Sequence, residues 1–169
     1  MFRAPFYRQQ KHFTCGPAVL RMALAAHGRR LTEAYLTKKC ETSARHGSSN
    51  FGLMRCLRSM GVSYITEYRA RYRDLGWYLR KGIVIVDWMP QLIFPDHPEF
   101  APSPQYDPDE DAHYAIVVSA GEIYITLQDP VLGRRIRVRR SEFVRAWRDP
   151  TSQTAHWVMV VQPPGHETQ

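Results

Sequence analysis

Apolar residues in the first part of the chain recur every three or four positions, the spacing of one helix face. The run from Pro17 to Ala26 opens with a residue that suits a first helical turn, because the missing proline N–H would have no intrahelical partner there. Thr32 is a candidate N-cap, and Gly61 closes a later amphipathic segment with Cys56 on its core face. The pattern predicts three helices, over residues 17–26, 31–40 and 53–60.

After Val62 the pattern changes to short runs of apolar and β-branched residues, which are typical of strands. The run from Ile83 to Trp88 is apolar almost throughout and predicts a central strand. Asp74 and Ser141 are candidate openings of two short helices that extend to residues 81 and 147. The predicted strands cover residues 62–68, 83–88, 113–119, 123–129, 134–140 and 155–162. Helices come first and strands later, which indicates the α+β class.

Two of these strands form a predicted hairpin that begins with His113 and ends with Asp129. A three-residue loop, Ala120 to Glu122, would place His113 directly opposite Asp129, with Cβ atoms roughly 5 Å apart. A two-residue loop would place His113 opposite Gln128 instead. Either register leaves the imidazole close enough to bond the carboxylate.

Residues 94–112 hold five prolines and six acidic residues but no Lys or Arg, so we expect no regular element there. The simplest interpretation is a solvated surface loop, although long loops in compact domains often act as lids. This segment ends directly before His113. Its acidic charge could screen a basic cleft. We expect one domain over residues 1–169, with a core of about 7–161, an insertion loop at 94–112 and a frayed tail at 163–169.

The net charge of +7 and a pI of about 9.6 raise nucleic acid as a possible partner. The arginines of residues 134–140 alternate with Ile136 and Val138, as on a solvated strand face, and no nucleic-acid motif accompanies them. A nucleic-acid partner is therefore not expected. Apolar runs are all shorter than the roughly 20 residues that cross a bilayer, and the start does not resemble a signal peptide, so we expect a cytoplasmic protein.

The chain has three cysteines at wide spacing, which indicates neither a disulfide framework nor a zinc site, and no cofactor is expected. Cys15 precedes the first predicted helix. Helix N–H groups and the helix dipole favour a thiolate there, which makes Cys15 a candidate nucleophile. A lone cysteine is more often a packing residue, so the interpretation depends on a partner histidine. Of seven histidines, His113 has an acid placed beside it, and His156 is its chief rival.

Five features, in this order, resemble the bacteriocin-processing cysteine peptidases that cut double-glycine leader peptides. They are Gln9 six residues before Cys15, the Cys15-Gly16-Pro17-Ala18 helix start, the Ser48-Ser49-Asn50-Phe51-Gly52-Leu53 turn, His113 opening a strand, and Asp129-Pro130 sixteen residues later. The resemblance covers about residues 7–161 and implies a papain-like α+β fold, in which an N-terminal helical part packs on an antiparallel β-sheet.

The same resemblance implies a role for each matching residue. Cys15 would be the nucleophile, His113 the general base and then acid, Asp129 the residue that orients the imidazole, and Gln9 the oxyanion donor, with the adjacent Gln10 as the alternative. The expected activity is cysteine-dependent hydrolysis of a peptide or protein substrate. Acyl transfer or transpeptidation on the same fold, and a non-catalytic module that binds peptide or nucleic acid, are the alternatives.

Overall fold

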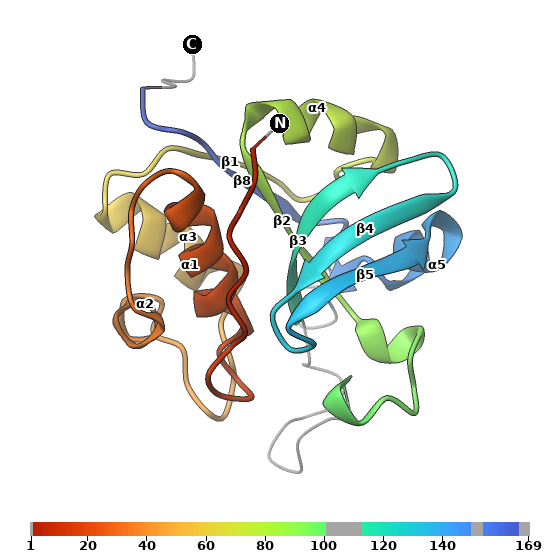
Figure 1. Cartoon of the computed structure of the whole chain (residues 1–169), viewed down its shortest axis with the longest axis horizontal. Coiled ribbons are helices and arrows are strands. Elements are labelled where there is room, and N and C mark those ends of the chain that lie inside the picture. The colour runs from red at the N-terminus through yellow and green to blue at the C-terminus, as the bar shows by residue number, and fades with distance from the viewer. Residues whose placement is uncertain (1, 101–112, 150–153, 166–169) are drawn as a thin grey trace.

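The computed structural model describes residues 2–100, 113–149 and 154–165. Three helices form its N-terminal part, in the red to yellow segment of Figure 1. Thr32 accepts a hydrogen bond from the Tyr35 N–H, and Ser49 accepts one from the Gly52 N–H, so polar caps fix where the second and third helices begin. The helices are α1 (Cys15–Ala26), α2 (Glu33–Lys39) and α3 (Asn50–Ser59).

An antiparallel sheet of six strands in the order β1-β8-β2-β3-β4-β5 forms the other part, with a separate two-stranded pairing of β6 and β7. Every residue of β2 is buried, and β2 pairs with β3 on one side and β8 on the other, which confirms the predicted central strand. The strands are β1 (Tyr64–Glu67), β2 (Ile83–Trp88), β3 (His113–Ala120), β4 (Tyr124–Asp129), β5 (Arg134–Arg139), β6 (Arg148–Asp149), β7 (Thr154–Ala155) and β8 (Val158–Val161).

Apolar side chains cover both faces of the sheet. Alternate residues of β2 belong to two different clusters: Ile83 and Ile85 pack with the three N-terminal helices, while Val84 and Val86 pack on the opposite face. The second cluster includes side chains of α4 (Leu75–Lys81) and α5 (Arg140–Ala146). Helices packed on an antiparallel sheet confirm the predicted α+β class. Within the described ranges, no helix combines the length and apolar character needed to cross a membrane.

Two of the differences from the predicted boundaries have a clear physical cause. The N-cap of α5 is Arg139, so Ser141 lies inside the helix and does not cap it. The Arg140 N–H still donates to the Ile123 carbonyl at 2.8 Å, and the chain therefore passes directly from strand pairing into the helix. The predicted strand 155–162 is broken at His156, whose φ of +66° takes it out of the extended conformation and separates β7 from β8.

The acidic and proline-rich segment contains more structure than expected. A 3₁₀ helix, η3 (Pro98–Phe100), follows the turn η2 (Pro90–Leu92), so the expectation that residues 94–112 hold no regular element is wrong for this short stretch. Pro98 suits the first position of η3 because its missing N–H is not needed there. The rest of the expected insertion, residues 101–112, and the end of the expected tail, residues 166–169, lie outside the described residues.

Candidate active site

Cys15 is the first residue of α1 and is 8% exposed. The first helical hydrogen bond joins the Ala18 N–H to the Thr14 carbonyl at 2.9 Å, so the N–H groups of Cys15 and Gly16 precede the helical ladder. The positive end of the helix dipole and these donors favour negative charge at this point. The helix start therefore places the Cys15 side chain beside the positive end of the helix dipole.

Gly16, the next residue, allows the loop before α3 to pack against the start of α1. A Cβ atom at Gly16 would lie 2.5 Å from Ser48 Oγ and 2.7 Å from Ser48 Cβ. Ser48 is held in turn, because its Oγ bonds Thr42 Oγ1 at 2.7 Å and its carbonyl accepts from the Tyr114 hydroxyl at 3.2 Å. The same hydroxyl donates to Asn50 Oδ1 at 2.8 Å. The Ser48 to Leu53 motif is thus held in place by hydrogen bonds and packs against the start of α1, next to Cys15.

His113, at the start of β3, lies against Asp129, at the end of β4. The His113 Nε2–H donates to Asp129 Oδ2 at 2.8 Å. The other carboxylate oxygen, Oδ1, accepts from the N–H groups of Val131 at 2.9 Å and Leu132 at 3.0 Å. Asp129 has no exposed surface, and three donors hold its carboxylate in one orientation.

The protonation of His113 reflects these neighbours. Burial lowers the pKa of His113, but the Asp129 charge and the hydrogen bonds with Asp129 and Cys15 outweigh burial and raise the pKa from 6.5 to about 10. Because Nε2 is bonded to Asp129, Nδ1 is the ring nitrogen left to face Cys15. His113 therefore lies between the thiol and the carboxylate and is an imidazolium at neutral pH.

Both predicted hairpin registers are wrong, although the predicted contact forms. β3 and β4 pair with Ile116 opposite Gln128, and a bulge between Val117 and Ser119 adds one residue to β3. Extending this register places Asp129 opposite Ala115, two residues from His113 and on the same face of the sheet. His113 and Asp129 are thus diagonal neighbours, a separation that an imidazole and a carboxylate can span.

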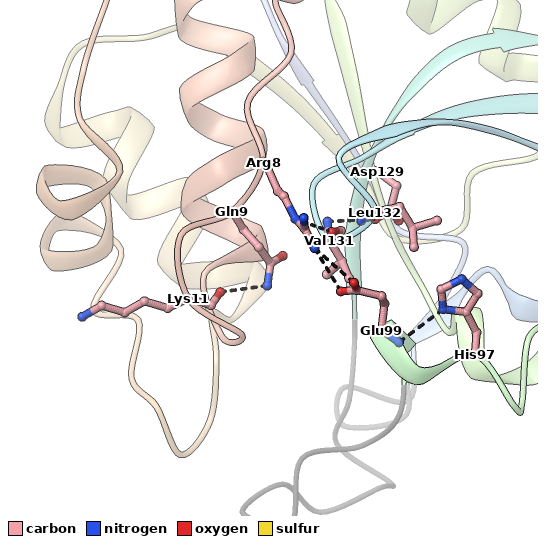
Figure 2. A network of polar contacts seen from close by, with 8 residues as sticks. All are labelled: Arg8, Gln9, Lys11, His97, Glu99, Asp129, Val131 and Leu132. Carbon is pink, nitrogen blue, oxygen red and sulfur yellow. Dashed lines mark hydrogen bonds and ion pairs between the residues drawn. The ribbon is translucent and has the colours of Figure 1, made fainter.

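Of the two adjacent glutamines, Gln9 is the one that is bonded to the turn after Asp129. Its N–H donates to the Pro130 carbonyl at 2.9 Å, which ties the N-terminal segment to the turn after Asp129. Its side-chain Nε2 donates to the backbone carbonyls of Lys11 at 2.8 Å and His12 at 3.0 Å; the Lys11 bond is drawn in Figure 2. Gln10 is exposed, and its backbone N–H bonds a Glu33 carboxylate oxygen at 2.7 Å.

The rival histidine, His156, belongs to a different part of the molecule. Its ring stacks on Trp147 with centroids 4.8 Å apart, and Nδ1 lies 3.1 Å from the Ala70 carbonyl oxygen. These contacts help to hold the break between β7 and β8, so the role of His156 is structural.

Two aromatic rings beside His113 were not anticipated from the sequence. The Trp88 and Phe100 ring centroids lie 6.4 Å and 5.7 Å from that of His113. Trp88 is the strand partner of His113 in the β2–β3 ladder, so correct pairing of these two strands would have found it. Phe100 comes from η3, and the sequence carries no local signal that would bring it here. Among residues 2–100, 113–149 and 154–165, no group of three or more His, Cys, Asp or Glu residues is placed to hold a metal ion.

Comparison with known proteins gives relatives in both sequence and structure. The sequence model of a protein family, described as the Peptidase C39 family, matches residues 3–91, more than half of the chain. An uncharacterized protein of Methanothermobacter marburgensis is 32% identical over 136 residues, covering 80% of this chain and 78% of the relative. A protein of Methanothermobacter thermautotrophicus is 28% identical over 137 residues, covering 81% and 78%.

Solved structures share the fold at low sequence identity. The peptidase domain of Streptococcus ComA, a bifunctional ABC transporter, matches with a TM-score of 0.67 and 17% identity, covering 96% of this chain and 99% of that one. A double glycine motif protease from an AMS/PCAT transporter, solved with a leader peptide, matches with a TM-score of 0.67 and 18% identity, covering 96% and 93%. A C39-like peptidase from Bacillus anthracis, named as putative, has a TM-score of 0.63 and 13% identity, covering 94% of each chain. The chain therefore belongs to the peptidase C39 family and is a papain-like cysteine peptidase.

Proposed function

We propose that this peptidase hydrolyses an amide bond with Cys15 as nucleophile, His113 as proton carrier, Asp129 as the residue that orients His113, and Gln9 as an oxyanion donor. The observation that carries the proposal is the position of His113, which bonds a buried carboxylate on one side and the Cys15 side chain on the other. A pKa of about 10 keeps His113 cationic at neutral pH, which favours a thiolate at Cys15.

In the first step, the Cys15 thiolate attacks the carbonyl carbon and the C=O electron pair moves onto oxygen. His113 then gives its Nδ1 proton to the leaving nitrogen as the C–N bond breaks, leaving a thioester on Cys15. In the second step, neutral His113 takes a proton from water, and the resulting hydroxide attacks the thioester. This attack gives a tetrahedral intermediate, whose collapse releases the carboxylic acid product and leaves Cys15 as thiolate and His113 as imidazolium.

The oxyanion forms beside the start of α1, where the Cys15 N–H precedes the helical ladder. The Gln9 amide supplies a second donor. One N–H of the Gln9 amide can donate to the Lys11 and His12 carbonyls together, as a bifurcated donor. The second N–H of the same amide can then donate to the oxyanion. Gln10, exposed and bonded to Glu33 through its backbone, is the weaker candidate.

The substrate class follows from the relatives by analogy. The double glycine motif protease was solved with a leader peptide, and we propose a peptide substrate for this chain on that likeness. We further propose that the chain works as a single domain, because α1 carries Cys15 and packs against β3, which carries His113. Cys15, Cys40 and Cys56 are free, which fits a reducing compartment such as the cytoplasm.

The test compares Cys15→Ala with Cys40→Ala, a matched removal of a buried thiol outside the site. Each protein is incubated with a peptide library that includes diglycine sequences, and products are read by mass spectrometry with and without an added amine. We expect cleavage by the parent and the Cys40→Ala protein, and loss of cleavage in Cys15→Ala. Equal cleavage by the Cys15→Ala protein would refute the proposal, and products that carry the added amine would show acyl transfer in place of hydrolysis.

A further inference from the structure

Phe100 covers one side of the proposed catalytic pair. Its ring meets the His113 ring in an edge arrangement, with centroids 5.7 Å apart. In this arrangement Cys15 and His113 are each only 8% exposed. A polypeptide must approach both the thiol and the imidazole in order to react. Phe100 therefore lies against a site whose two reacting residues are both little exposed.

Aromatic contacts hold Phe100 in this position. It stacks on Phe94 at 5.9 Å and contacts Trp88 at 6.3 Å and His97 at 5.2 Å. The Phe100 N–H donates to the His97 carbonyl at 2.9 Å, and the Glu99 N–H donates to His97 Nδ1 at 3.2 Å. The short segment 94–100 is thus a folded unit held by its own ring contacts and hydrogen bonds.

One ion pair joins this segment to the N-terminal segment of the chain. Arg8 Nη2 lies 3.1 Å and 3.3 Å from the two Glu99 carboxylate oxygens, as Figure 2 shows. Arg8 Nε also donates to the Val131 carbonyl at 3.1 Å, and the Arg8 side chain packs at the Gly133 position. Arg8 is therefore anchored on the turn that fixes Asp129, next to the Gln9 segment.

We propose that residues 94–100 form a gate over Cys15 and His113, that the Arg8–Glu99 ion pair holds this gate closed, and that Phe100 and Glu99 thereby determine which peptides reach the thiol. The inference deepens the proposed function, on which it rests for the identity of the site. The side chains of Arg8 and Glu99 are 61% and 44% exposed, so salt screens their attraction and the pair is easily broken. Opening then separates Glu99 from Arg8 and lifts Phe100 from the imidazole.

The experiment measures how fast iodoacetamide, a small uncharged reagent, alkylates Cys15, with peptide mapping to resolve it from Cys40 and Cys56. We expect Glu99→Gln to raise the rate about two- to fivefold at low salt, the size of effect that an exposed ion pair supports. Phe100→Ala should raise it further. The parent rate should increase with added sodium chloride, whereas the rate of the Glu99→Gln protein should not.

Glu41→Gln is the matched control, because Glu41 forms an exposed ion pair with Arg55 away from the site. Its alkylation rate should equal that of the parent at every salt concentration. Circular dichroism melting of each variant checks that the fold is kept, and the exposed Glu99→Gln change tests the gate even if Phe100→Ala unfolds. Unchanged alkylation in Glu99→Gln, or the same increase in Glu41→Gln, would overturn the gate.

Alkylation reports access to the thiol and needs no hydrolysis. A gated Cys15 in a protein that cleaves no peptide would refute the proposed hydrolysis and leave the gate standing. Hydrolysis that is lost in Cys15→Ala, together with alkylation that does not respond to Glu99→Gln, would refute the gate alone.

Discussion

Replacing Asp129 with Asn changes the charge and hydrogen bonding of the site while keeping the shape of the side chain. The amide oxygen can still accept from the N–H groups of Val131 and Leu132, which now bond Oδ1. The amide nitrogen then faces His113 Nε2, in place of the carboxylate oxygen at 2.8 Å. Two donors cannot bond each other, so Nε2 must become an acceptor and the ring proton must move to Nδ1. That nitrogen faces Cys15 and can no longer take a proton from it.

The expected loss of Cys15 reactivity in the Asp129→Asn protein follows from the pKa of His113. With a pKa of about 10, more than about 99% of His113 is imidazolium at pH 7.5. Burial lowers the pKa of His113, and Asp129 provides the strongest interactions that raise it, so without the Asp129 charge the pKa should fall from about 10 towards the ordinary 6.5. At a pKa of 6.5 the imidazolium share at pH 7.5 is about 9%, so alkylation of Cys15 should slow by up to about tenfold. Turnover should fall further, towards the factor of about 10⁴ seen for the equivalent change in a Ser-His-Asp triad, because the tautomer is also wrong.

The assay is the pH profile of Cys15 alkylation, followed site by site with iodoacetamide in the parent, Asp129→Asn and Asp87→Asn proteins. Asp87 is a matched control, since it is also a fully buried strand carboxylate, but its Oδ2 accepts from Asn50 Nδ2 at 3.3 Å. Asp87→Asn should lower stability and leave the shape of the profile unchanged. A profile for Asp129→Asn that matches the parent would refute the role given to Asp129.

Two further predictions concern stability. A Cβ at Gly82 would lie 2.2 Å from the Val161 carbonyl oxygen, so Gly82→Ala should lower the free energy of unfolding by about 3 kcal/mol or more in urea titrations. Gly76→Ala, at a helical position with open space among the described residues, should raise it by about 0.5–1 kcal/mol, and a similar loss at both positions would contradict this reasoning. The raised pKa of His113 means that the folded protein keeps a proton that the unfolded chain releases between pH 6.5 and about 10. The stabilisation is complete below pH 6.5 and is lost as pH rises towards 10, by up to about 1.4 kcal/mol per pH unit. Urea titrations of His113→Gln should lack this loss of unfolding free energy between pH 6.5 and about 10. The same pH dependence in the parent and the variant would argue against the raised pKa of His113.

Local signals in the sequence were sufficient for most of the fold. Thr32 predicts a helix start by itself, because an N-cap bonds an N–H within three residues. The β-branched run from Ile83 to Trp88 predicts a buried strand by itself, because such a strand needs apolar side chains on both faces. Cys15 at a helix start was predictable because Pro17 suits a first helical turn. Ser141 had the right chemistry for a cap, but pairing between Arg140 and Ile123 decided where the helix begins.

The site was predictable only in outline. His113 and Asp129 were correctly expected to meet, but a bulge between Val117 and Ser119 shifts the pairing, and a bulge leaves no reliable mark in one sequence. The contacts of Arg8 with Glu99, and of Phe100 with His113, join segments that no local pattern relates. Such contacts depend on how the whole chain folds, which is why they emerge from the structure alone.

The place of β8 in the sheet has a consequence for biosynthesis. Because β8 lies between β1 and β2, β1 cannot join the six-stranded sheet until Val158 to Val161 have been synthesised. Strands β2 to β5, which include the strand that carries His113, pair with one another without β8. The last strand to be synthesised therefore adds β1 to a sheet whose other strands are already available to pair.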